Sequence, residues 1–129
     1  MAKNYAVSLA LIILSALFDS YAAFVVKLKF NELGPMDFTS FGDFFVYLLK
    51  LASSPLFLSG LATFILAPGI WFFALNRVDL SVGYPTLVGF HLIFVLIFGV
   101  FFLGEAFTLR KGVSVSLILF SLYLLFKTP

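Results

Sequence analysis

The stretch SVGYPTLVGFHLIFVLIFGVFFL, residues 81–103, decides the fold because it contains no Asp, Glu, Lys or Arg. A helix of about 20 such residues crosses roughly 30 Å of hydrocarbon. Three further apolar stretches occur at about residues 5–30, 56–75 and 109–126. Inside lipid, backbone polar groups must be paired within a helix or a closed barrel, and the strict polar–apolar alternation of a barrel is absent. The sequence therefore predicts four transmembrane helices.

The composition of the whole chain supports the same class. Of 129 residues, 63% are hydrophobic and 11% are charged, whereas soluble domains contain roughly 25% charged residues. Nineteen Phe and five Tyr add more apolar surface than so short a chain can hide from water. We predict a single all-α integral membrane domain over residues 1–129, in the inner membrane.

Several functional classes find no support in the residues. Lys and Arg are scattered without a basic stripe, which argues against nucleic-acid binding. Cysteine is absent, which excludes disulfides, thiol catalysis and thiolate metal sites. Neither a phosphate loop, a Ser–His–Asp order nor metal-ligand spacing occurs, so we expect no enzyme, no cofactor and no metal site. The N-terminal run continues to Val26, which is too long for a cleaved signal peptide.

The connections between the predicted spans are unequal. NRVDL (76–80) and GEAFT (104–108) are tight turns that make neighbouring spans antiparallel, whereas the first connection is long. In it, one helical face carries Phe41, Phe44, Phe45, Leu48 and Leu49. This pattern predicts a short helix between Met36 and Ala52, lying in the headgroup layer. The alternative interpretation is that the segment extends the second span.

Positive charges are divided almost evenly between the two predicted sides. One side carries Lys3, Arg77 and Lys127, and the other carries Lys29, Lys50, Arg110 and Lys111. A bias of four to three hardly fixes an orientation under the positive-inside rule. Either the side with four charges is inside, or the chain inserts both ways and pairs with itself in antiparallel fashion.

Two charges interrupt the first span. Asp19 and Lys27 lie on nearly the same helical face, roughly 12 Å apart along the axis, with Ala23 between them. A charged side chain at membrane depth is costly and indicates a functional site by default, while Lys27 is near enough to the end to snorkel. We expect Asp19 to face a polar cavity with Lys27 and Tyr84 nearby. The structural alternative is that Asp19 only bonds Ser or Tyr neighbours.

The third span carries the other polar candidates. Tyr84 offers a ring and a hydroxyl to a substrate path, and His91 is the only histidine. Because imidazole titrates near neutrality, His91 is a candidate proton relay, although a lone His in a helix is more often a satisfied core donor. Pro85 removes an N–H and predicts a kink near residues 82–84.

The remaining features that we single out have structural interpretations. Small residues predict close helix packing at Gly83, Gly89 and Gly99. Glu105 is placed to pair with Arg110 or Lys111, or to cap the next helix together with Thr108. Trp71 is typical of an interfacial anchor.

Three stretches carry a resemblance to a known family. They are the pair Asp19 and Lys27, the segment WFFALNRVDLSVGYPTLVG (71–89) with Trp71, Tyr84 and Gly89, and the segment FFLGEAFTLRKG (101–112). Together they resemble the drug/metabolite transporter superfamily, and within it the EamA-like proteins and the four-helix small multidrug resistance type. The resemblance implies a small transporter that works as a homodimer, or as a heterodimer with a similar subunit.

The substrate implied by this resemblance depends on where the chain departs from the drug exporters. Asp19 stands where those proteins have Glu, Leu87 stands where they have Trp, and their first connection is short. The Tyr84–Pro85 pair and the extra amphipathic stretch are more similar to subunits that flip lipid-linked aminoarabinose. We therefore expect a flippase for a lipid-linked sugar or similar amphiphile, with Asp19 at the headgroup, Lys27 at the phosphate and Tyr84 along the path.

Two other functions stay open from the sequence. One is proton-coupled export of a small organic cation, in which Asp19 alternates between proton and substrate. The other is a subunit without transport activity that assembles a larger membrane complex.

Overall fold

The computed structural model describes residues 2–127, with side chains from residue 5 onward. The first and last residues of the predicted domain, 1 and 129, and the side chain of Lys3 are therefore outside the described part of the chain. Five helices follow one another along the chain: α1 (Ala2–Leu33), α2 (Phe41–Ala52), α3 (Pro55–Leu75), α4 (Leu80–Phe101) and α5 (Leu109–Lys127). The described residues contain no strand, so the prediction of an all-helical fold is confirmed.

Four of these helices are long and apolar enough to cross a membrane, namely α1, α3, α4 and α5. This confirms the predicted number of spans and gives the chain the architecture of a multi-pass membrane protein. With 32 residues, α1 is about 48 Å long, which exceeds a hydrocarbon layer of roughly 30 Å. Its ends therefore extend beyond the apolar layer, or the helix tilts.

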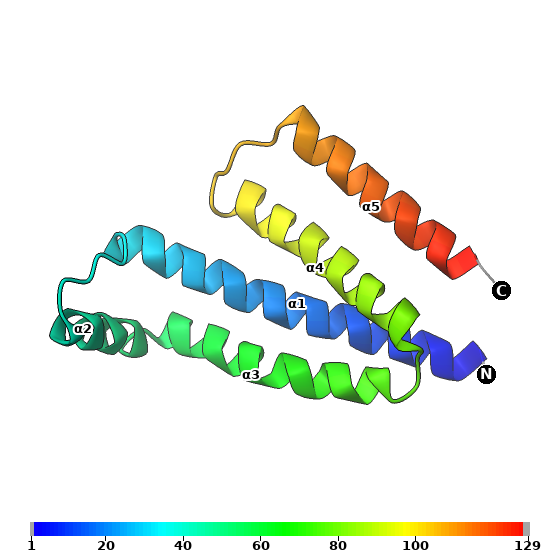
Figure 1. Ribbon diagram of the computed structural model, residues 1–129, viewed down its shortest axis with the longest axis horizontal. Helices are drawn as coiled ribbons and strands as arrows, with labels where there is room; N and C mark the ends of the chain where they lie inside the picture. Colours follow the sequence, from blue (N-terminus) through cyan, green and yellow to red (C-terminus); the bar gives the residue numbers. More distant parts are fainter. Residues whose placement is uncertain (1, 128–129) are drawn as a thin grey trace.

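The long helices form a row in the order α3, α1, α4, α5 (Figure 1). Helix α1 packs along both α3 and α4, whereas α5 packs mainly on α4. The core lies along α1 and consists largely of small residues, among them Ser15, Ala16, Ser20 and Ala22. Small side chains let helices approach closely in lipid, where no hydrophobic force drives them together.

The contact between α1 and α3 is close enough to join a side chain to the opposite backbone. The Ser15 hydroxyl donates a hydrogen bond to the carbonyl oxygen of Ala67 over 2.8 Å. Nearly three turns further along α1, Val25 is fully buried against Gly60, which has no side chain of its own. This packing fixes the rotation of α1 and therefore decides which neighbours Asp19 meets.

Helix α2 is a separate element that precedes the second span. Ser53 ends it, and Ser54 then caps α3 by accepting a hydrogen bond from the backbone N–H of Phe57 over 3.3 Å. Pro55 occupies the first turn of α3, where its missing N–H costs nothing. The chain therefore does not run as one helix from α2 into α3. Figure 1 shows the change of direction, because α2 is foreshortened while α3 is seen from the side.

The ends of α2 are held by polar contacts. Ser40 caps its start, with the backbone N–H of Asp43 donating to the Ser40 hydroxyl over 3.2 Å. The Thr39 hydroxyl donates to the Asp43 carboxylate over 2.7 Å. The hydrogen bond from the Thr39 side chain to the Asp43 carboxyl group, and to a lesser degree that from the Ser40 side chain, lower the pKa of Asp43. The Tyr47 hydroxyl then fastens the helix to the end of α1 by donating to the carbonyl oxygen of Gly34 over 3.0 Å.

Candidate functional site

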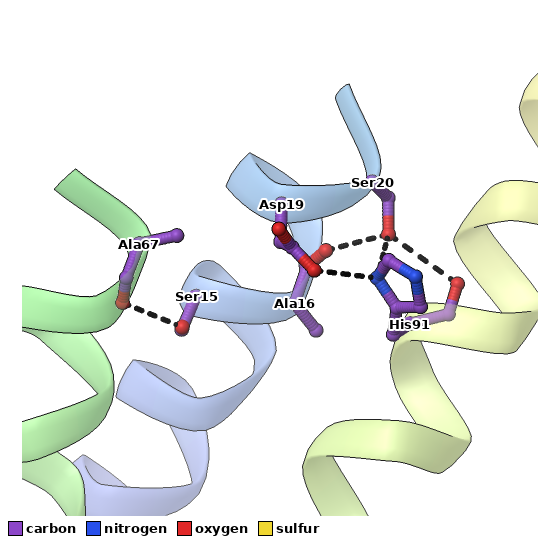
Figure 2. A network of polar contacts seen from close by, with 6 residues as sticks. All are labelled: Ser15, Ala16, Asp19, Ser20, Ala67 and His91. Atoms are coloured by element: carbon purple, nitrogen blue, oxygen red, sulfur yellow. Dashed lines mark hydrogen bonds and ion pairs between the residues drawn. The ribbon is translucent and has the colours of Figure 1, made fainter. Parts of the chain in front are cut away.

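A polar contact joins α1 and α4 (Figure 2). The Asp19 carboxylate oxygen Oδ2 lies 3.2 Å from Nδ1 of His91, and their side chains are 45% and 30% exposed, respectively. Both residues lie near the middle of helices that are apolar enough to span a membrane. The pair is therefore placed at membrane depth, where ionisable groups are expensive and need a partner.

Ser20 orients the imidazole ring. Its hydroxyl Oγ lies 2.6 Å from the carbonyl oxygen of Ala16, 3.1 Å from His91 Nδ1 and 3.3 Å from the His91 carbonyl oxygen. A hydroxyl has one proton to donate and can also accept. When the proton goes to Ala16, the closest acceptor, Oγ accepts from an Nδ1–H. In that arrangement the Nδ1–H group lies between Ser20 and Asp19, and Figure 2 shows the two oxygens facing the same nitrogen.

Asp19 also lines a pocket between α1 and α3, which we call the α1–α3 pocket. Its volume is about 350 Å³. Apart from Asp19, its lining is apolar or glycine: Ala22, Ala23, Val26, Phe57, Gly60, Leu61 and Phe64. Phe64 is 55% exposed and Leu61 42%, so the pocket opens on the flank of the bundle. In a bilayer that flank faces lipid.

A second, smaller pocket lies between α1 and α4, and we call it the α1–α4 pocket. Its volume is about 90 Å³, and its polar lining residues are Ser20, Lys27 and Glu105. Ala23 lines both pockets and lies between them on the surface of α1. Lys27 and Glu105 bring charges of opposite sign to this small space.

The predicted neighbours of Asp19 differ from those that the structure places there. Lys27 lines the α1–α4 pocket, whereas Asp19 lines the α1–α3 pocket. Tyr84 lies in the first turns of α4, is 55% exposed and packs edge-on against Trp71, with ring centroids 6.3 Å apart. The side chain that meets Asp19 is that of His91, so two candidates considered separately in the sequence form one site.

The small residues of α4 lie where other side chains approach its backbone. Gly83 faces the Trp71 ring, Gly89 faces Leu122 of α5, and Gly99 faces the Glu105 carboxylate. The helix runs without a break through Pro85. Directly after Pro85, the Thr86 hydroxyl donates a hydrogen bond to the carbonyl oxygen of Val82 over 2.7 Å, within the same turn of the helix.

Glu105 is positioned by the turn that follows α4. Gly104 has φ +70°, a conformation that glycine adopts without strain, and the Glu105 N–H donates to the Gly99 carbonyl oxygen over 2.9 Å. The Glu105 carboxylate lies 3.8 Å from Nζ of Lys111. At the start of α5, the Thr108 hydroxyl accepts from the N–H of Lys111 over 3.3 Å, as an N-cap does.

Two polar residues of the site region were missed in the sequence. One is Ser20, which is completely buried. The other is Tyr21, whose hydroxyl lies 2.9 Å from the Ser59 hydroxyl of α3. The recurrence of serine in apolar helices could have indicated such contacts, because a buried hydroxyl group needs a hydrogen-bond partner. Among the described residues, no group of His, Asp or Glu side chains is arranged to hold a metal ion.

Comparison of the chain with protein-family models, with curated proteins and with solved structures finds no match.

Proposed function

We propose that this protein is a small transporter of the inner membrane, and that it moves a lipid-linked sugar or similar amphiphile between leaflets. The observation that carries the proposal is the placement of Asp19 in the wall of the α1–α3 pocket. A half-exposed carboxylate there is surrounded by apolar side chains on a face that opens sideways. Such a pocket suits a molecule with a polar head and an apolar body.

The pocket chemistry supports this class of substrate. Ligand sites are commonly apolar with a few polar groups that fix orientation. In this case the ring of Phe57 or Phe64 contacts the apolar part, while the Asp19 carboxylate accepts hydrogen bonds from a hydroxyl-rich or cationic head. Lateral opening allows a lipid to enter without leaving the bilayer. Lys27 lines the α1–α4 pocket on the other side of Ala23, so in this proposal the substrate head extends across Ala23 and places its phosphate at Lys27.

The surface of α5 and the resemblance to small multidrug resistance proteins support a dimer as the working unit. Within the described residues, α5 has only Leu122 buried, and it packs mainly on α4. Four helices in a row enclose little space between them. A second copy, or a similar subunit, completes the wall of the transport path, and α2 lies at the headgroup level beside the opening.

The experiment is transport of a fluorescent short-chain polyprenyl-phosphate sugar in liposomes that contain the full chain. We expect Asp19→Asn to reduce transfer between leaflets only partly, because the amide still forms hydrogen bonds. Lys27→Ala should reduce it further, since the phosphate loses its charged partner. Asp79→Asn is the matched control, because Asp79 is exposed in the α3–α4 turn and its side chain caps nothing. Unchanged transfer in both test variants would refute the proposal.

A second function, proton-coupled export of a small organic cation, is favoured by the contact between Asp19 and His91. Two titratable groups 3.2 Å apart can exchange a proton as a cation comes and goes. For this function we expect Asp19→Asn to abolish uptake of a fluorescent organic cation that is driven by a pH gradient. Uptake that persists in Asp19→Asn excludes this mechanism and leaves the flippase proposal standing.

A further inference from the structure

His91 and the α1–α3 pocket approach Asp19 from different sides. The lining of the pocket comes from α1 and α3, whereas the imidazole comes from α4 (Figure 2). His91 is not among the residues that line the pocket. A ligand in the pocket therefore reaches the carboxylate without displacing the imidazole, and the carboxylate can have both neighbours at once.

The charged surroundings leave Asp19 and His91 dependent on each other. Helix α3 carries no charged residue, and α4 carries none except His91 if it is protonated. On α1, Lys27 is the next charged residue, and it lines the α1–α4 pocket with Glu105. The charges of α5, packed behind α4, lie near its ends at Arg110, Lys111 and Lys127. Other titratable groups are engaged elsewhere, since Tyr21 contacts Ser59 and Tyr84 packs on Trp71.

We infer that Asp19 and His91 share one exchangeable proton, and that His91 takes this proton when a cationic group occupies the α1–α3 pocket. Before the transfer, the neutral imidazole carries its proton on Nε2, and its unprotonated Nδ1 faces the protonated Asp19 carboxyl group. The O–H bond of that carboxyl group breaks and an N–H bond forms at Nδ1 of His91. The new Nδ1–H then lies between the Asp19 carboxylate and the Ser20 hydroxyl. A carboxylate and an imidazolium result, so the net charge of the pair is unchanged by the transfer. The imidazolium later gives its proton to water. Ser20 is a positioning residue, because its hydroxyl holds the ring with Nδ1 toward the carboxylate.

This inference rests on the second function proposed above, cation export, and adds the group that receives the proton. One carboxylate cannot hold a proton and a cation together, so a nearby acceptor is needed for exchange at membrane depth. With His91 as acceptor, the proton leaves Asp19 on the α4 side while the cation enters on the α3 side.

The single histidine makes the test direct. The full chain is labelled with ¹⁵N-histidine, placed in lipid nanodiscs, and titrated from about pH 4 to about pH 9, the range of carboxyl and imidazole groups. The two ring nitrogens then report the protonation of His91 alone. Coupled groups titrate in two macroscopic steps, so we expect two steps in the wild-type chain and a single step in Asp19→Asn. Asp19→Glu should restore two steps, and the control Asp79→Asn should keep them.

The Ser20→Ala variant tests the positioning role. Loss of the hydroxyl should change the ratio of the two neutral imidazole forms, which ring-nitrogen shifts distinguish. A merely structural serine would leave that ratio unaltered. An identical single-step titration in the wild-type chain and Asp19→Asn would show that the two groups share no proton, and would overturn the inference.

The effect of a bound cation on His91 is tested with the permanently charged benzyltributylammonium ion, which is added at constant neutral pH. We expect the imidazolium fraction of His91 to rise at least about twofold in the wild-type chain and not in Asp19→Asn, since the ligand shifts the population it favours. Calorimetry measures the binding separately. Binding without any change at His91 overturns the transfer step. Absence of binding contradicts cation export instead, and the titration without ligand still decides whether the proton is shared.

Discussion

The side chain of Val25 in α1 occupies the space that a Cβ atom at Gly60 in α3 would need. Such an atom would lie 2.9 Å from Cβ and 3.0 Å from Cγ1 of Val25. The Val side chain is branched next to the backbone, and it is stiff at χ1. It cannot turn aside as a long side chain does, so the helices themselves would have to separate.

Gly60→Ala should therefore destabilise the chain. We expect the free energy of unfolding to fall by about 1–3 kcal/mol, as in other overpacked contacts, when unfolding in mixed micelles is followed by circular dichroism. Gly69→Ala is the control in the same helix, because a Cβ there meets nothing within 4 Å. Equal stability of the two variants would show that α1 and α3 do not pack as described.

The pH dependence of α2 follows from Asp43, because the Thr39 hydroxyl, and to a lesser degree the Ser40 hydroxyl, hold the pKa of its carboxyl group below the usual range. Since the folded-state pKa is lowered, the carboxylate stabilises the helix start at pH values above the unfolded-state pKa. The contribution is lost as the pH falls through the folded-state pKa. We expect the backbone chemical shifts of Ser40 and Asp43 to move toward coil values only under acidic conditions. Asp43→Asn should weaken this response, and an unchanged response would contradict the cap.

The position of α2 at the membrane surface is our prediction from its amphipathic face. Phe45 is 54% exposed and Leu49 is 55% exposed. Such large apolar side chains are unfavourable in water, whereas the edge of a lipid layer would cover them. The chain has no cysteine, so single spin labels can be placed at Phe45, Leu49 and Asp43. We expect oxygen to relax the first two labels and a water-soluble nickel complex to relax the third. Equal access of the nickel complex to all three would place α2 in water.

Dual orientation, which an antiparallel dimer of identical chains requires, is tested by single cysteines in the turns. A cysteine at Asp79 and one at Glu105 lie at opposite ends of α4. If the chain inserts both ways, an impermeant reagent added to intact cells should modify about half of each population. Modification of only one of the two positions means a single orientation. A parallel homodimer, or a partner inserted in the opposite direction, would then be required.

The regular part of the fold could be predicted from the sequence because the spans are long, apolar and separated by turn residues. The sequence left open whether the segment before Ala52 extends the second span, although the break has a local signal: Ser54 precedes Pro55 as a cap precedes the first turn. The position of α2 relative to the lipid also stayed open. That position depends on the interaction of its apolar face with the bilayer, and not only on contacts within the chain.

The candidate site could be predicted only as separate residues. Asp19 and His91 stand out because each is polar in an apolar helix, but their meeting depends on how α1 rotates against α4. That rotation is set by packing at positions such as Gly60 and Val25, which a single sequence does not pair. Spacing along one helix predicted that Lys27 shares a substrate path with Asp19 without contacting it directly. The structure places Lys27 in the other pocket, because residues two turns apart face different neighbours when three helices meet.

Trp71, packed edge-on against Tyr84 beside Gly83, gives the protein a built-in optical reporter. It is the only tryptophan in the chain, so all indole fluorescence originates from the junction of α3 and α4. Its emission spectrum follows the polarity around that one ring, and energy transfer from tyrosine adds a signal sensitive to separation. Stopped-flow spectroscopy of the native chain, without a dye, can therefore time any movement of α4 in the transport cycle that we propose.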